Sequence, residues 1–136
     1  MTKTVWLRIS SVIAFLFAAG HTLGGLKHWS PMGENPVLKA MRETQFETMG
    51  VSRTYLDFYM GFGYSLTVLE LLLSVLLWQL SRVAPTAGLR VRPMIAVIAL
   101  ATLVNGIIAW QFIFPVPALF SLVLFASLAV AFAVAR

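Results

Sequence analysis

The stretch Thr54–Leu80, TYLDFYMGFGYSLTVLELLLSVLLWQL, decides the fold of this chain. As one continuous helix it would be roughly 40 Å long, which is enough to cross a membrane. Glu70 lies near its middle, in the run VLELLLSVLL, with apolar neighbours on both sides. An ionisable group at that depth is costly and usually faces the interior of a helical bundle. The other apolar segments are therefore expected to shelter this helix.

The composition places the chain among integral membrane proteins. Of its 136 residues, 60% are hydrophobic and 11% are charged, whereas soluble domains are about half apolar and about a quarter charged. The excess predicts a single membrane domain, residues 1–136, with transmembrane helices at about 5–25, 54–80, 93–114 and 118–135. The first of these is interpreted as a retained helix, because its apolar run is long for a signal peptide.

Proline and asparagine mark where the helices should begin and end. Asn35-Pro36 has the form of an N-cap followed by a first-turn proline, which predicts a short helix from about Pro36 to Thr48 in the first loop. Pro93 fits the first turn of the third transmembrane helix, and Pro115-Val116-Pro117 is expected to force a tight turn before the fourth. The predicted fold class is all-α: a four-helix transmembrane bundle with a short extra-membrane helix.

The basic residues predict the orientation. The start of the chain, its end and the Ser81–Arg92 loop carry Lys and Arg without Asp or Glu, whereas the first loop mixes both signs. By the positive-inside rule, both termini and the second loop are expected in the cytoplasm, and the protein in a bacterial-type inner (plasma) membrane.

Helical rise places the polar side chains in layers. Glu70 and Asn105 are expected near the midplane, and His21, Tyr64 and Gln111 roughly 8–12 Å closer to the outside. Glu70 has no Lys or Arg at its depth, so we expect a neutral acid that is hydrogen-bonded to Asn105. Three interpretations remain open for Glu70: a structural link between helices, a proton-transferring or ligand-polarising group, and a cation site.

An aromatic-lined concavity is predicted on the outer side of Glu70, with Gly61 and Gly63 leaving room for it. The alternative is that these side chains fill the bundle or form an interfacial aromatic belt. The candidate ligand-binding residues are His21, Tyr59, Tyr64, Glu70, Asn105, Trp110 and Gln111.

Several classes of chemistry lack a basis in the sequence. The chain has no cysteine, which excludes disulfides and thiolate metal sites. It contains no H-E-x-x-H, phosphate-binding glycine loop or nucleophile elbow, and its basic residues flank the apolar segments rather than forming a nucleic-acid surface. We assign no metal site and no nucleic-acid partner, and the cofactor is left unknown.

Three stretches carry a family resemblance: VLELLLSVLL, GHTLGG and RTYLDFYMGFG. With a first helix ending in a glycine-rich turn and a third leading through Phe-Pro into a fourth, the chain resembles the DoxX-like small four-helix bacterial membrane proteins. The resemblance implies a four-helix membrane fold, and some DoxX relatives are linked with quinone-reducing membrane complexes. Because this chain lacks cysteine and any cofactor motif, the redox activity is not carried over.

The leading functional hypothesis is a non-catalytic membrane protein that binds a lipid or quinone-like amphiphile in an outward-opening intramembrane pocket. Its partners would be membrane lipids and either a larger membrane complex, as a small subunit, or a homo-oligomer. One alternative is a membrane enzyme of the proton-shuttling lipid isomerase type, with Glu70, His21 and Asp57 as candidate catalytic residues. The other is a structural assembly subunit.

Overall fold

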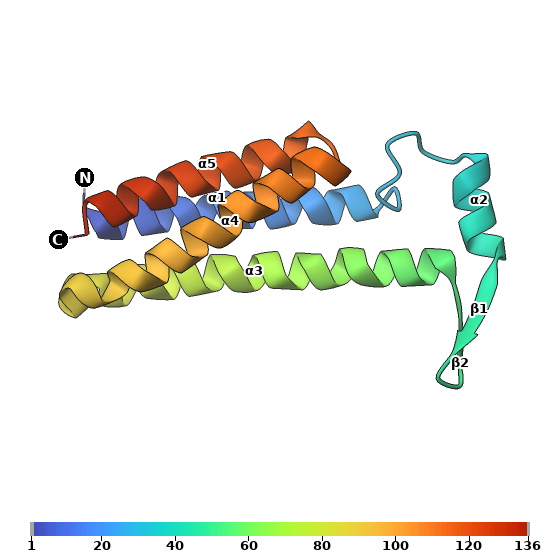
Figure 1. Ribbon diagram of the computed structural model, residues 1–136, viewed down its shortest axis with the longest axis horizontal. Coiled ribbons are helices and arrows are strands. Elements are labelled where there is room, and N and C mark those ends of the chain that lie inside the picture. Colours follow the sequence, from blue (N-terminus) through green and yellow to red (C-terminus); the bar gives the residue numbers. More distant parts are fainter. Residues whose placement is uncertain (1, 136) are drawn as a thin grey trace. The chain divides into compact units, whose positions relative to one another are not determined.

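The computed structural model describes residues 2–135, and most of them are helical. The elements run in chain order (Figure 1) as α1 (Lys3–Gly25), α2 (Pro36–Glu43), β1 (Gln45–Thr48), β2 (Val51–Thr54), α3 (Tyr55–Ala87), the 3-10 turn η1 (Gly88–Val91), α4 (Arg92–Phe112) and α5 (Pro115–Ala133). The predicted all-α class is confirmed as a mostly helical chain.

The first loop differs from its prediction in its second half. Asn35 caps α2 as expected, because its side-chain oxygen accepts hydrogen bonds from the backbone N–H groups of Val37 and Leu38. The helix ends at Glu43, however, and not near Thr48. Residues 45–54 form an antiparallel β-hairpin whose turn holds Met49 and Gly50, both at positive φ. The left-handed pair makes the tight reversal that a helix could not.

Two helix boundaries also move. α3 continues to Ala87 with Pro85 inside it, so much of the expected 81–92 loop is helical or 3-10. Pro85 lies two residues before the end of α3, so the kink that a proline causes affects less than one further turn. α5 begins at Pro115 rather than Ala118, because the first helical turn does not need the N–H groups that Pro115 and Pro117 lack. Pro93 lies in the first turn of α4, as predicted.

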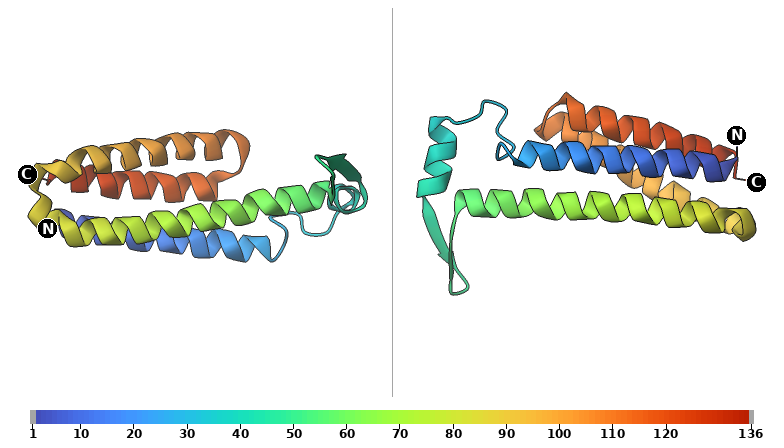
Figure 2. Two further views of the ribbon diagram at one scale, coloured as in Figure 1. Left: turned by 90° about the horizontal axis from the view of Figure 1, so that it is seen from below. Right: turned by 180° about the vertical axis from the view of Figure 1, so that it is seen from behind.

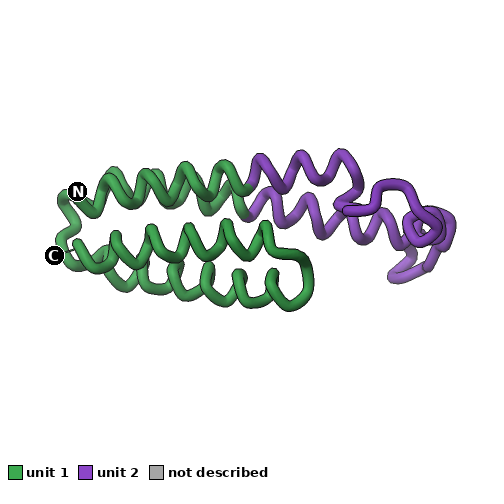
Figure 3. The backbone as a smooth tube through the Cα atoms, turned by 90° about the horizontal axis from the view of Figure 1, so that it is seen from above, with its two compact units in different colours: residues 1–17, 70–136 green, residues 18–69 purple. Residues whose placement is uncertain are grey.

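The chain divides into two compact units (Figure 3). Unit 1 comprises residues 1–17 and 70–136, and unit 2 comprises residues 18–69. The residues of α1 and α3 are shared between them. The prediction of one single membrane domain stays a prediction.

Unit 1 packs four helical segments around a core of small and branched side chains. α4 and α5 lie side by side (Figure 2), and they approach closely at Gly106, where an added Cβ would lie 3.1 Å from Cβ of Ser121. The first part of α1 is tied to α5 by Ser10 and Ser127, whose hydroxyls are 2.8 Å apart. Small residues at helix contacts and hydroxyl bonds between helices are typical of membrane interiors. The core residues are Leu7, Ala14, Leu77, Leu80, Ala84, Val91, Ile95, Ala99, Leu124, Leu128, Ala131 and Ala135.

Three helical stretches in the described chain are long and apolar enough to cross a membrane: Lys3–Gly25, Tyr55–Phe112 and Pro115–Ala133. The second contains α3, η1 and α4. Large aliphatic side chains remain exposed along these helices, for example Val97 at 68% and Leu100 at 61%. So much exposed apolar surface suits lipid rather than water, and the chain is a membrane protein by these criteria.

Candidate functional site

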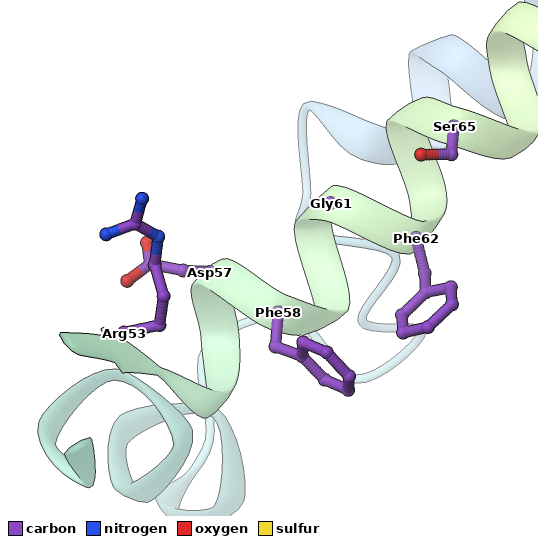
Figure 4. Close-up of a pocket in the computed structure, with 6 residues that line it drawn as sticks. All are labelled: Arg53, Asp57, Phe58, Gly61, Phe62 and Ser65. Atoms are coloured by element: carbon purple, nitrogen blue, oxygen red, sulfur yellow. The ribbon is translucent and has the colours of Figure 1, made fainter. Parts of the chain in front are cut away.

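A pocket lies in unit 2, on the first turns of α3 (Figure 4). Its volume is about 310 Å³, and it is shallow and open. We call it the α3 groove; it is lined by Arg53, Asp57, Phe58, Gly61, Phe62 and Ser65.

Helical periodicity builds the α3 groove from two neighbouring rows. Asp57, Gly61 and Ser65 follow each other at steps of four, and Phe58 and Phe62 form the adjacent row. Gly61 leaves the floor open, since an added Cβ there would meet nothing within 4 Å. The two phenyl rings meet edge to face with centroids 4.9 Å apart. An apolar row therefore lies beside a row of small and polar residues on the same helix.

The charged end of the α3 groove belongs to a capping box that begins α3. The Thr54 hydroxyl accepts a hydrogen bond from the backbone N–H of Asp57 at 3.0 Å. In return, Oδ2 of Asp57 accepts from the backbone N–H and the hydroxyl of Thr54, at 2.9 and 2.8 Å. This reciprocal pairing satisfies donors that a helix start leaves open. The motif is visible in the sequence as Thr54-x-x-Asp57. The capping box therefore gives Asp57, one of the candidate catalytic residues, a structural role.

A second aromatic group, the Trp29 cluster, fills the part of unit 2 where the sequence predicts a cavity; it comprises His21, Trp29, Tyr59, Gly63 and Tyr64. The indole of Trp29 stacks on the His21 ring with centroids 5.0 Å apart, and its Nε1–H donates to the His21 carbonyl at 2.8 Å. The rings of Tyr59 and Tyr64 contact the indole edge to face, with centroids 6.3 and 5.4 Å from it.

Glycine is required where the indole lies against helix backbone. A Cβ added at Gly63 would overlap three ring carbons of Trp29, and one at Gly25 would come within 2.8 Å of the same ring. His21 Nε2 also lies 3.0 Å from the Gly63 carbonyl. His21, Tyr59 and Tyr64 thus all contact Trp29, a side chain of the protein itself, and their role as ligand-binding residues stays a prediction. Trp29 is not among the predicted ligand residues, because the sequence does not show which way the side chain of a loop residue turns.

The backbone at His28 and Trp29 is strained. α1 ends in a Schellman-type turn in which the N–H of Trp29 bonds the Gly24 carbonyl at 3.0 Å and the N–H of His28 bonds the Gly25 carbonyl at 2.9 Å. His28 and Trp29 have φ values of 53° and 48°, a region that normally favours glycine. Packing of the indole holds these two residues in place.

Glu70, the first residue of the second segment of unit 1, lacks the partner predicted for it. Its side chain is buried with 7% exposure, and neither carboxyl oxygen has a hydrogen-bond partner among residues 2–135. Asn105 instead donates to the Ser121 hydroxyl at 3.4 Å. The expected bond from Glu70 to Asn105 is wrong, because α4 turns this amide towards α5.

The other predicted ligand residues are dispersed. Trp110 is 68% exposed and Gln111 is exposed, both near the end of α4 in unit 1. A site that combines them with His21 stays a prediction. Within the part of the chain that the structure describes, no three His, Asp or Glu side chains gather closely enough to hold a metal ion.

Comparison with protein-family models, with curated proteins and with solved structures finds no match for this chain. The resemblance to the DoxX-like proteins therefore stays a prediction, and the site has to be interpreted from its own geometry.

Proposed function

We propose that the chain crosses a bacterial-type inner membrane four times, as a transmembrane bundle of α1, α3, α4 and α5. The stretch Tyr55–Phe112 has 58 residues, which is more than two crossings of about 20 residues each need. It reverses at η1, and α3 and α4 then supply one crossing each, since α4 alone has 21 residues.

Both termini would lie in the cytoplasm. Lys3 Nζ donates to the Gly88 carbonyl at 3.0 Å, so the start of α1 and the α3–α4 connection occupy the same end of unit 1. That end carries Arg82, Arg90 and Arg92, which supports its cytoplasmic placement.

The α3 groove then falls at the outer membrane surface. Arg8 lies over the Trp78 ring at 5.5 Å from its centroid, a pair suited to the cytoplasmic interface. Phe58 precedes Trp78 by twenty residues along α3, which corresponds to about 30 Å, the thickness of the hydrocarbon core. Phe58 and Phe62 would therefore meet the part of the acyl chains next to the headgroups, with Arg53 in the headgroup layer.

The function we propose on this basis is binding of a lipid or quinone-like amphiphile in the α3 groove, without catalysis. The observation that carries it is the arrangement of the groove: an aromatic wall next to a glycine floor, with Arg53 and Asp57 at one end (Figure 4). Its volume of about 310 Å³ is at the low end for ligand sites and suits one ring or a short length of chain. Membership of a larger complex or a homo-oligomer stays a prediction.

The test uses the full-length protein in nanodiscs with a diazirine-bearing palmitic acid as photoreactive probe. We expect the probe to crosslink to residues 53–65, and Phe62→Ala to weaken binding by about 1–2 kcal/mol, or about 5- to 30-fold. Phe15→Ala is the matched control, because Phe15 is a similarly exposed phenylalanine on α1 outside the groove.

Competition identifies the class of amphiphile. Displacement by unlabelled fatty acid but not by a short-chain quinone would select a lipid, and the reverse would select a quinone. Equal crosslinking of the Phe62→Ala and Phe15→Ala variants, with both folded by circular dichroism, would refute the proposed function.

A further inference from the structure

Glu70 differs from the other buried polar side chains of unit 1. Ser10, Ser74 and Thr102 are each buried and each has a hydrogen-bond partner at 2.9 Å or less. Glu70 is more than nine-tenths buried, yet both its oxygens lack a partner among residues 2–135. A buried carboxyl in this position costs several kcal/mol unless something outside the polypeptide satisfies it.

The nearby hydroxyls on the same helix face have no proton to offer. The Ser11 hydroxyl donates to the Ser74 carbonyl at 2.8 Å, and the Ser74 hydroxyl donates to the Ser11 carbonyl at 2.9 Å. Each hydroxyl has one hydrogen, so only lone pairs remain for other contacts. Ser74 lies four residues after Glu70 on one face of α3, so Glu70 is next to acceptors rather than donors.

The charged groups of the surrounding elements are also committed elsewhere. From α1, Lys3 bonds the Gly88 carbonyl and Arg8 lies over Trp78, eight residues or about 12 Å along α3 from Glu70. From α4, Arg92 lies over the Phe132 ring at 4.3 Å, and its Nε is buried without a hydrogen-bond partner among residues 2–135. Arg92 is the first residue of α4, next to η1, and no contact joins it to Glu70. Of the remaining basic groups, the His21 ring lies next to the Gly63 carbonyl. Arg82 and Arg90 are exposed, and both follow Trp78 in the chain and are therefore further from Glu70 than Trp78 is.

The described residues of α5 include no Asp, Glu, Lys, Arg or His. The antiparallel pairing of Ser11 with Ser74 and of Arg8 with Trp78 brings Ala14 to the level of Glu70, and Ala14 is buried. None of these described neighbours offers Glu70 a positive charge or a free hydroxyl proton. These leave the negative charge of a carboxylate without a counter-charge inside unit 1.

We propose that Glu70 is a reversible proton-binding site inside unit 1. The carboxylate takes up one proton to give the neutral acid, and it releases the same proton to give back the carboxylate. The neutral acid needs no counter-ion and supplies the donor that the serine lone pairs lack. A metal cation such as Na⁺ fits less well, because hard cations need several oxygen ligands and the site offers few besides the carboxyl. This inference does not depend on the α3 groove.

Carbodiimide labelling tests the proposal on the full-length protein in detergent or nanodiscs. Dicyclohexylcarbodiimide enters apolar sites and reacts with a carboxyl that carries its proton: the acid adds across a C=N bond, and the acyl group then migrates to nitrogen to leave a stable acylurea. We expect one adduct on the peptide containing Glu70, detected by mass spectrometry and absent in Glu70→Gln. Its rate should fall about tenfold per pH unit on the alkaline side of the titration.

Each further result decides for or against the site. A labelling rate that does not change between about pH 5 and pH 9, or no adduct on Glu70 at any pH, would overturn the proposal. Protection by Na⁺ at constant pH, compared with choline at equal ionic strength, would assign the site to a metal ion and also overturn it. These arms use the wild-type chain, so they stand even if Glu70→Gln does not fold. An infrared carboxylic-acid band that is lost with rising pH would support the same assignment independently.

Discussion

Two glycines of α3, two residues apart, make a matched pair for testing the Trp29 cluster. Gly63→Ala places a Cβ where three ring carbons of Trp29 lie, whereas Gly61→Ala places one in open space. Both positions are inside the same helix. Both substitutions should gain about 1 kcal/mol from helix propensity, so this term cancels when the two variants are compared.

The remaining difference measures how firmly Trp29 is held. A rigid indole cannot yield as a flexible chain end would, so overpacking should cost about 1–3 kcal/mol. Displacing the ring also breaks the hydrogen bond from Nε1–H to the His21 carbonyl, which is worth about 1 kcal/mol. We therefore expect Gly63→Ala to be about 2–4 kcal/mol less stable than Gly61→Ala.

Unfolding by SDS titration in mixed micelles, followed by circular dichroism, would measure this difference. A shift of the Gly63→Ala midpoint to lower SDS should come with a change in tryptophan emission as the indole leaves its glycine bed. Equal midpoints for Gly61→Ala and Gly63→Ala would show that Trp29 does not pack as described, and the reasoning would fail.

Three further predictions concern the same structure. His28→Gly should stabilise the protein by about 1 kcal/mol in the same titration, because it removes the cost of φ 53° from the turn after α1; destabilisation would mean that the His28 side chain has a role of its own. Thr54→Ala should cost about 1 kcal/mol by opening the capping box, and Thr54→Ser should restore most of it; equal loss in both would exclude the hydroxyl as the cause. Single cysteines, which the chain otherwise lacks, should react with an impermeant maleimide from the cytoplasmic side at Thr2 and Ala87 and from the opposite side at Gly33; reaction of Gly33 and Ala87 from one side would refute the four-crossing topology.

The sequence predicted most of the helices because their signals are local. Asn35-Pro36 and Pro93 mark helix starts through chemistry that acts within one turn, and the structure confirms both. The β-hairpin was missed because its support comes from a distance: Phe46 packs on Tyr55 and Phe58, with centroids 5.1 and 5.8 Å away. The spacing of residues within 45–54 does not show this packing, so it could not predict the hairpin.

The candidate site shows the same division between local and distant causes. Depth along a helix places His21 and Tyr64 at one level, and in the structure both rings contact Trp29, but depth does not specify how each helix is rotated about its axis. The rotation of α4 directs Asn105 towards Ser121, so that Glu70 has no hydrogen-bond partner among residues 2–135. The conformation of residues 28 and 29 decides that an indole occupies the expected cavity. Both depend on tertiary packing, which single-residue spacing does not encode.

The unequal lengths of α3 and α5 have a consequence for the surrounding bilayer. α5 has 19 residues and spans about 28 Å, whereas α3 has 33 residues and spans about 50 Å. The shorter helix sets the hydrophobic thickness that the protein matches best, and the longer one must tilt or extend into the headgroups. Lipids with long or rigid chains would leave the ends of α5 below the surface and thin locally around them. The protein should therefore favour thinner regions of a membrane, and lipid chain length becomes a variable that changes its stability without any change of sequence.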